Sequence, residues 1–193
     1  MPEIMLFPLS SVVLPEGKMR LRIFEPRYKR LISQALKSDG CFGICLFDPA
    51  QAKSSGELSA VGTLVKITDF ESLDDGLLGI SVTGLKKFRI QRVRVEYDGL
   101  RLARVESLSN WDVTSLDYQA EPLSQGLAKI YQQFPDLGEL YQQRFFDDAS
   151  WVTQRWLEIL PMSNQKFDSL VTQADCSGAI EFLKRTLNNT QVQ

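Results

Sequence analysis

The chain has 193 residues, a hydrophobic content of 44% and a net charge of −2, so it can bury a substantial core and carries no overall charge that would attract nucleic acid or anionic lipid. It contains no histidine, which excludes the Ser-His-Asp triad and the HExxH zinc site. We expect its three cysteines to be reduced thiols, and we expect no metal and no cofactor. Glu3 stands where a signal peptide would carry positive charge, and no stretch approaches the roughly 18 apolar residues of a membrane span. The sequence therefore predicts a soluble, cytoplasmic protein.

The first part of the chain predicts two strands followed by a helix. The strands are "IMLFPLSSVVLP" and "MRLRIF", and Pro8 and Pro15 place the first of them at a sheet edge or a bend, because proline cannot donate to a strand ladder. Pro26 suits the first position of a helix, and Glu25 before it is favoured by the helix dipole, so we expect a helix over residues 26–38. Helical spacing of apolar residues predicts its inward face: Tyr28, Leu31, Ile32, Ala35 and Leu36.

Residues 41–107 have the pattern of a β-sheet. "CFGICLF" (41–47) is a short apolar run between turn residues, and a second alternating run ends in a hairpin turn at "DDG" (74–76). Two further strands are expected at "LLGISVTG" and "KKFRIQRVRVEYDG", the latter with a bulge near Gln91 and Arg92, where the apolar residues change parity. "LRLARVESL" (100–108) closes the series. Six or more short strands with a single helix indicate a closed or nearly closed β-barrel.

After Ser109 the apolar residues follow helical spacing. They predict five helices, with Leu123, Leu127, Ile130 and Phe134 in the first, Leu137, Leu140, Tyr141 and Phe145 in the second, Trp151, Val152, Trp156, Ile159 and Leu160 in the third, Phe167, Leu170 and Val171 in the fourth, and Ile180, Leu183 and Leu187 in the last. Pro161 ends the third helix, and Asp175 caps the last. We therefore predict an α+β protein with a β-barrel domain over residues 1–110 and a helical domain over residues 118–190.

Nucleotide and protease motifs are missing. No G-x-G occurs, and the Gly-Lys pair of the sequence lacks the first glycine and the Ser or Thr of a Walker loop. Ser163 and Lys166 form S-x-x-K, but the S-D-N and K-T-G companions of a Ser-Lys acylation site are absent. We therefore expect that the chain is not an enzyme. An enzyme that acts on a small ligand in a cavity is kept as an alternative.

Basic residues gather on adjacent predicted strands, which is the pattern of a nucleic-acid-binding face. The residues of this alternative site are Lys86, Lys87, Arg89, Arg92 and Arg94. Glu96, Asp98 and Glu106 are interleaved with them, so an ordinary solvated sheet face explains the same pattern.

The order of these segments resembles the N-terminal substrate-binding domain of the Lon protease family. The similar segments are "FPLSSVVLPEGKMRLRIFEPRYKRLISQAL", "FGICLF", "VGTLVKI", "DGLLGISVTGLKKFRI" and "ARVESL". The resemblance covers residues 4–108 and extends more loosely to about residue 188. It implies a PUA-like β pseudo-barrel with one inserted helix, followed by a C-terminal α-helical bundle. In Lon this region helps to recognise unfolded or tagged protein substrates, and its core is also found in cereblon.

Lon continues into an ATPase module and a Ser-Lys protease module where this chain ends, so the resemblance implies neither activity here. It implies a non-catalytic polypeptide-recognition module, an adaptor for proteolysis or quality control that binds exposed polypeptide segments for a protease or chaperone. We do not expect nucleic acid or a membrane as a partner.

The corner between the second strand and the helix is the predicted peptide-binding site. Its residues are Phe24, Glu25, Pro26, Arg27 and Tyr28. A strand-to-helix junction explains these residue types without any ligand. The functional hypothesis is that the corner borders a groove between barrel and helices that accepts an extended segment, with strand addition at a free barrel edge as another route.

Overall fold

The computed structural model describes residues 2–51 and 57–190 and divides the chain into two compact units. The strand unit comprises the residues up to Asn110 together with Ser163–Gln165, and the helical unit comprises Trp111–Met162 and the residues from Lys166 onward. Strands and helices are thus largely segregated along the chain, as in an α+β protein. None of the helices in the described ranges is long and apolar enough to cross a bilayer.

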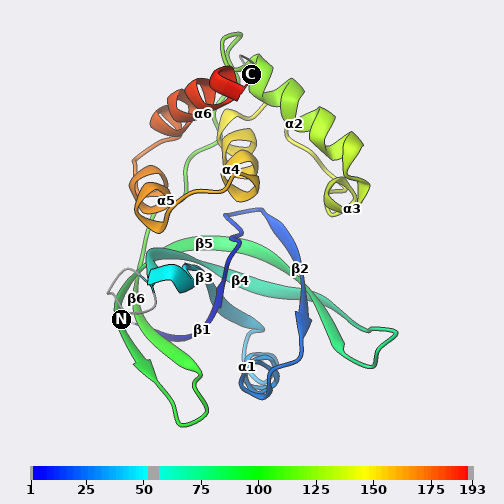
Figure 1. Ribbon diagram of the computed structural model, residues 1–193, viewed down its shortest axis with the longest axis vertical. Coiled ribbons are helices and arrows are strands. Elements are labelled where there is room, and N and C mark those ends of the chain that lie inside the picture. Colours follow the sequence, from blue (N-terminus) through cyan, green and yellow to red (C-terminus); the bar gives the residue numbers. More distant parts are fainter. Residues whose placement is uncertain (1, 52–56, 191–193) are drawn as a thin grey trace. The chain divides into compact units, whose positions relative to one another are not determined.

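The strand unit contains six strands among the described residues (Figure 1). Their bounds are Glu3–Leu9 (β1), Lys18–Ile23 (β2), Cys41–Phe47 (β3), Leu58–Ser72 (β4), Leu78–Val95 (β5) and Arg101–Ser107 (β6). Helix α1 (Pro26–Leu36) lies between β2 and β3 in the sequence, and a single turn of 3₁₀ helix, Pro49–Gln51, follows β3. The helix begins at the expected proline and ends two residues earlier than predicted.

The strands form one mixed sheet whose pairings close into a ring. The order is β2-β5-β4-β3-β1-β6, and β6 also pairs with β5. β1 and β3 run parallel, whereas the other pairs are antiparallel. β2 pairs with Leu78–Thr83 of β5, and β6 pairs with the later part of β5, from Phe88 to Val95. β2 and β6 therefore lie one after the other along the same edge of β5, and β2 is not part of the closed ring.

The prediction of two short strands at "LLGISVTG" and "KKFRIQRVRVEYDG" is wrong, because both lie in the single 18-residue strand β5. Gly84, at the expected break, is a point of close packing. A Cβ atom there would lie only 2.1 Å from the carbonyl oxygen of Leu14. The Gly84 carbonyl accepts a 2.8 Å hydrogen bond from the N–H of Glu16, and its N–H donates one of 2.8 Å to Gly17. The turn before β2 is thereby held on β5, and the predicted bulge is confirmed by a register shift between Ile90 and Arg92.

The core of the strand unit lies between α1 and the inner face of the strands. Four apolar residues of α1 are buried in it: Tyr28, Leu31, Ile32 and Ala35. Leu36 was predicted to join them, but it is exposed at the last turn of the helix, because the chain leaves the helix there and turns through Gly40 with φ +76°. The Gly40 N–H donates to the carbonyl of Ala35, which satisfies one carbonyl at the helix end.

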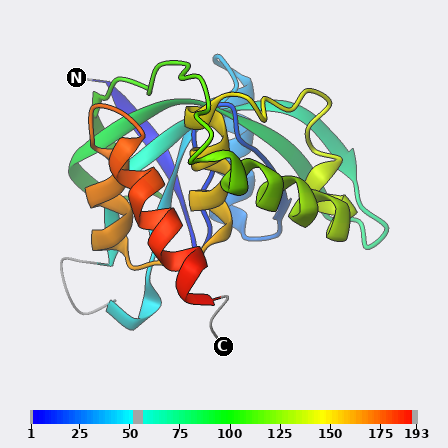
Figure 2. The ribbon, with the colours of Figure 1, turned by 90° about the horizontal axis from the view of Figure 1, so that it is seen from above.

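The helical unit contains five helices among the described residues (Figure 2). Their bounds are Glu121–Gln133 (α2), Pro135–Gly138 (α3), Ala149–Ile159 (α4), Asn164–Val171 (α5) and Ser177–Thr190 (α6). α4 packs against both α2 and α6, and every residue from Ala149 to Leu157 is buried. The Asp175 carboxylate accepts a 2.9 Å hydrogen bond from the N–H of Ser177, as expected for the cap of the last helix.

The second predicted helix, with Leu137 to Phe145 on one face, is wrong beyond the single turn of α3. Gly138 sits so close to α2 that a Cβ atom would lie 2.7 Å from the carbonyl oxygen of Tyr131. The following segment is irregular and buries Tyr141 against Tyr131 with ring centroids 5.5 Å apart. Arg144 donates to the Gly138 carbonyl at 3.0 Å. The segment therefore buries its aromatic ring and satisfies that carbonyl without helical hydrogen bonds.

Candidate functional site

The strand unit has an open hollow of about 400 Å³ where β1, β2 and the start of α1 come together. We call it the β1–β2 groove. The residues that line it are Phe7, Pro8, Leu9, Arg20, Leu21, Arg22, Phe24, Glu25, Arg27, Tyr28, Phe47 and Arg101. Its volume lies in the range of ligand-binding clefts, which is about 300–1,000 Å³.

Two strand edges that have no strand partner among the described residues border the groove. β1 pairs with β3 as far as Leu9, but its pairing with β6 ends at Leu6 and Arg101. Pro8 lies in this singly paired part of β1, as expected for a residue that has no N–H to donate. β2 is the terminal strand of the sheet, and within the described residues its second edge has no strand partner. Alternate residues of such an edge direct their N–H and C=O groups outward, where another strand can pair with them.

The start of α1 forms one side of the groove. Glu25 is the N-cap residue of α1, and its carbonyl accepts hydrogen bonds from the N–H groups of Tyr28 and Lys29 at 3.0 Å. Its carboxylate does not cap the helix and instead accepts from Arg27 Nε at 2.8 Å. Arg27 also donates to the carbonyl of Gly99 at 3.3 Å. Both side chains at the corner are therefore held in place beside the hollow.

Aromatic rings form the floor of the groove. Phe7 stacks on Tyr28 with ring centroids 3.9 Å apart and planes inclined by 11°, and the guanidinium of Arg27 lies 4.8 Å from the Tyr28 ring. Burial raises the pKa of the Tyr28 hydroxyl, so the ring is neutral at physiological pH. Phe24 is different, because 61% of its side chain is exposed. An exposed phenylalanine beside a hollow offers apolar surface to a ligand.

Three further arginines line the groove. The guanidinium of Arg101 lies 5.5 Å from the ring of Phe47 and forms an ion pair with Glu57. Arg22 forms an ion pair with Asp75 of the β4–β5 turn. Arg20 makes no ion pair in the part of the chain that the structure describes. The groove therefore combines aromatic surface with guanidinium groups, a pairing that suits polypeptide ligands.

Four of the five residues predicted as a peptide-binding corner line this groove, and Pro26 does not, although it begins α1 as expected. The sequence reasoning missed the groove residues of β2, which directly precede the corner, and those of β1, β3 and β6, which lie farther from it in the chain. Two features of the sequence indicated the groove residues of β1 and β2, but only weakly. Pro8 marked an edge or bend, and the alternation of Arg20 and Arg22 with apolar residues in "MRLRIF" marked a strand with one charged face.

The predicted nucleic-acid site is not a continuous free basic face. Lys87 has only 2% of its surface exposed, and burial lowers its pKa to about 8. Arg94 forms ion pairs with Glu3 at 2.9 Å and with Glu96 at 3.1 Å. Arg92, Arg94 and Arg104 line a small hollow that Glu3 also lines.

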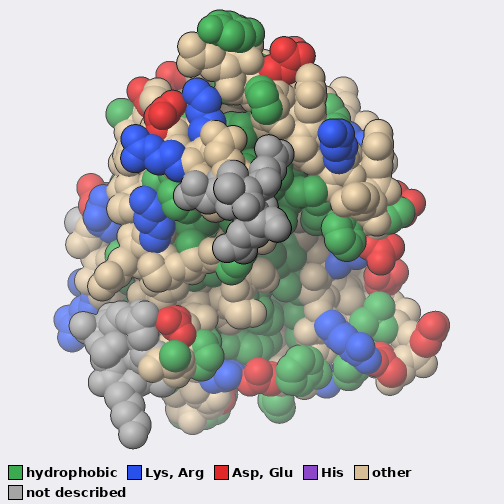
Figure 3. Space-filling view, turned by 45° about the horizontal axis from the view of Figure 1, so that its top comes forward, with side chains coloured by type: hydrophobic (Ala, Val, Ile, Leu, Met, Phe, Trp, Pro, Cys, Tyr) green, Lys and Arg blue, Asp and Glu red, His purple; other side chains and the backbone are tan. Residues whose placement is uncertain are grey.

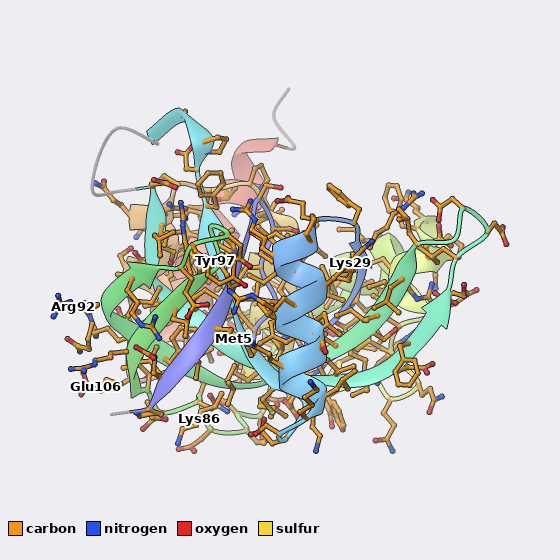
Figure 4. The ribbon with its side chains drawn as sticks, turned by 90° about the horizontal axis from the view of Figure 1, so that it is seen from below. Met5, Lys29, Lys86, Arg92, Tyr97 and Glu106 are labelled. Atoms are coloured by element: carbon orange, nitrogen blue, oxygen red, sulfur yellow. The ribbon has the colours of Figure 1, made fainter. Side chains whose placement is uncertain are left out.

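Acidic residues lie beside some of the exposed basic residues of β5, although Arg92 lies opposite Arg104 in the pairing with β6. Arg89 lies opposite Glu106 in the pairing of β5 with β6. Figure 4 shows Arg92 and Glu106 at the margin of the strands, away from α1. On the face of the molecule drawn in Figure 3, basic and acidic side chains are interspersed. The acidic side chains beside Arg89 and Arg94 reduce the positive potential that a phosphate backbone would meet on β5.

The loop between β5 and β6 is attached to α1 by a charged cluster. Arg30 donates to Asp98 at 2.7 and 2.8 Å and to Glu96 at 2.5 Å. These hydrogen bonds hold the pKa of Asp98 below its usual range. Tyr97, between the two acids, is 92% exposed, and the Arg30 guanidinium lies 5.3 Å from its ring. The cluster fixes this loop, whose Gly99 carbonyl receives the Arg27 hydrogen bond at the groove.

A second hollow of about 420 Å³ opens elsewhere in the strand unit, and Leu64, Phe88 and Leu102 are among the residues that line it. Among the described residues, no three His, Cys, Asp or Glu side chains are grouped so that they could hold a metal ion.

The strand unit is thus a ring of strands with one helix inserted after the second strand, as part of an α+β protein. The chain belongs to the family of the ATP-dependent protease La (LON) substrate-binding domain, whose sequence model matches residues 3–175. The resemblance predicted from the sequence is thereby confirmed. The family description indicates substrate recognition.

Solved structures with this fold include two Lon N-terminal domains. The chain is similar to a Lon N-terminal domain protein from Xanthomonas campestris, with 31% sequence identity, a TM-score of 0.74, and coverage of 96% of this chain and 98% of that one. It is also similar to the N-terminal domain of the Mycobacterium avium complex Lon protease, with 13% identity, a TM-score of 0.61, and coverage of 94% and 96%. At that identity the second likeness shows the fold alone. No curated protein matches the sequence.

Proposed function

We propose that the chain is a non-catalytic recognition module that binds extended polypeptide segments in the β1–β2 groove. It would serve as an adaptor in proteolysis or quality control in the cytoplasm, handing exposed segments to a protease or chaperone. In this proposal the ring of strands is a PUA-like pseudo-barrel, and residues 1–110 and 118–190 act as separate barrel and helical-bundle domains.

One observation carries the proposal. Open edges of β1 and β2 and the exposed ring of Phe24 border the same hollow. Backbone groups at a strand edge bind any extended segment irrespective of its sequence, and an aromatic surface adds affinity for apolar side chains. Both are properties that a receptor for many unfolded segments needs.

Binding of a fluorescently labelled, permanently unfolded polypeptide to the full chain tests the proposal. Phe24→Ala should weaken binding about tenfold, because exposed aromatic anchors contribute on the order of 1–2 kcal/mol when a ligand covers them. Phe70→Ala is the matched control, since Phe70 is 64% exposed on β4 and does not line the groove. Equal effects of the two variants, or no binding by the wild type, would contradict the proposal.

Nucleic-acid binding by the basic residues of β5 has weaker support than polypeptide binding in the groove. The ion pairs of Arg94 and the burial of Lys87 reduce the free positive charge that such binding needs.

A further inference from the structure

The charge of the β1–β2 groove points to a narrower class of ligand than unfolded polypeptide in general. Among the described residues that line it, four are arginines and one, Glu25, is acidic. Glu25 is already engaged by Arg27 at 2.7 Å. The remaining arginines are Arg20, Arg22 and Arg101, and no acidic side chain of the groove lining neutralises them.

The donors of these arginines are not all used. Arg101 donates one N–H group to Glu57 in the described contacts, whereas a guanidinium has five N–H groups. Arg22 is paired with Asp75, which lies in an exposed turn and does not line the groove. Arg20 forms no ion pair in the described part of the chain, although Asp69 and Glu71 line a small hollow next to it. A ligand carboxylate can therefore reach guanidinium donors without first displacing an acid from the groove wall.

The basic side chains lie on a strand whose outer edge is open. Arg20 and Arg22 are two residues apart on β2, so their side chains lie on the same face of the strand. A segment that pairs with this edge places its own alternate side chains beside them, where opposite charges attract and like charges repel.

From these contacts we infer that the β1–β2 groove selects acidic, extended peptide segments, which add to the outer edge of β2 as a further strand and place Asp or Glu side chains against Arg20, Arg22 and Arg101. This inference rests on the proposed function and names its substrate class. The same charges disfavour a second copy of this chain as the occupant, because pairing β2 with another β2 would bring arginines against arginines.

The apolar residues of the groove add a preference for apolar side chains in the ligand. Phe24 and Leu9 flank the same hollow as the arginines. A segment in which an aromatic or aliphatic residue alternates with acidic residues therefore matches both surfaces. Segments rich in Lys or Arg are rejected, since like charges in one groove cost affinity.

Fluorescence anisotropy with three labelled peptides tests this inference on the full chain. The peptides share one apolar framework and carry Glu, Gln or Lys at the same alternate positions. The Glu peptide should bind about tenfold more tightly than the Gln peptide, as expected for charge-assisted hydrogen bonds to guanidinium groups, and the Lys peptide should bind most weakly. The advantage of the Glu peptide should shrink as salt is added.

Two double variants locate the charge effect. Arg20→Gln with Arg22→Gln should abolish the preference for Glu over Gln. Arg89→Gln with Arg92→Gln changes the net charge by the same amount at exposed positions outside the groove, and should leave the preference intact. Equal loss in both double variants would show a general charge effect and would overturn the inference.

A Glu peptide methylated at alternate backbone nitrogens tests strand addition, because methylation removes the donors that pair with an edge. The peptide should bind at least about tenfold more weakly when the methylated nitrogens are those that face β2. Unchanged binding of both methylated peptides, one for each set of alternate nitrogens, would overturn the inference that the ligand adds as a strand.

If all three unmodified peptides bind equally, the selection for acidic segments is wrong while the proposed function stands. If none binds, both fail. A concentration-dependent dimer that excludes peptide, detected by light scattering, would identify a second copy as the occupant and contradict the inference.

Discussion

Two regions of the strand unit each bring several cations together, and they differ in what lies beside the charges. In the β1–β2 groove, the guanidinium groups of Arg27 and Arg101 lie over the rings of Tyr28 and Phe47, next to strand edges without a neighbour. On β5, between residues 86 and 94, the cations lie on a strand that pairs with β4 as far as Arg89 and with β6 from Phe88 onward, and Arg94 is bound by acids. The second region has the more conspicuous run of basic residues in the sequence, but we place the proposed ligand at the first, where aromatic rings and open strand edges lie beside the charges. The surroundings of a charge, more than the number of charges, indicate a binding site.

The largest expected effect concerns the floor of the groove. Phe7→Ala removes the ring that stacks on Tyr28 and leaves a cavity in the core, so it should lower the free energy of unfolding by about 3–5 kcal/mol. Urea unfolding followed by far-ultraviolet circular dichroism measures this, because all three tryptophans lie in the helical unit and would not report on the strand unit. Phe70→Ala removes an exposed ring and should change stability by less than about 0.5 kcal/mol. A similar loss in both variants would mean that the stacked pair is not part of the core.

The next effect concerns β5, which carries the second region and pairs with β2 of the first. Gly84→Val places side-chain atoms where the carbonyl oxygen of Leu14 lies, and should destabilise the protein by about 1–3 kcal/mol, as overpacking does. Because the turn from Leu14 to Gly17 leads directly into β2, peptide binding should weaken as well. Leu85→Val, at the exposed neighbouring position, is the control for thermal melting and for binding. Normal melting and binding by the Gly84 variant would show that this close contact does not position β2.

Binding measurements can compare one arginine of each region. Arg27→Gln removes the hydrogen bonds to Glu25 and Gly99 and should weaken binding of an unfolded polypeptide about three- to tenfold. Arg94→Gln removes ion pairs of β5 and should leave that binding unchanged. If the Arg94 variant lost more affinity than the Arg27 variant, β5 and not the groove would be the binding surface.

The smallest effect is a pH dependence of stability. Because Arg30 holds the pKa of Asp98 below its usual range, the folded state is stabilised at pH values above the unfolded pKa of this carboxyl, and the stabilisation is lost as the pH falls through the lower folded pKa. Wild-type protein should therefore lose more stability than Asp98→Asn as the pH falls below about 4. Asp74→Asn, in the exposed β4–β5 turn, should follow the wild type in urea titrations at several pH values. Parallel curves for the wild type and Asp98→Asn would contradict the role assigned to the Arg30 cluster.

The features that sequence predicts correctly here are local ones. Pro26 begins α1, Asp175 caps α6, and the parity change near Gln91 and Arg92 is a real bulge, because each depends on a few neighbouring residues. The merging of two expected strands into β5 depends on how the turn at Leu14 packs on Gly84, and no local pattern carries that information.

For the same reason, only part of the groove could be predicted from the sequence. Its corner residues are consecutive, so they could be named from the sequence. Its open edge on β1 exists because the pairing with β6 ends at Leu6 and Arg101, a property of register between strands almost a hundred residues apart in the chain. The irregular segment after Gly138 shows the same limit in the helical unit, where aromatic packing overrides helical spacing.

Hydrogen exchange of the full chain, with and without a saturating unfolded polypeptide, tests the central claim most directly. Backbone amides of an open strand edge exchange readily, and pairing with a ligand strand protects them. We predict that protection on binding appears in residues 18–28, which comprise β2 and the first turn of α1. Protection confined to residues 86–94, or no change in exchange anywhere in the strand unit, would contradict the claim that the β1–β2 groove is the polypeptide-binding site.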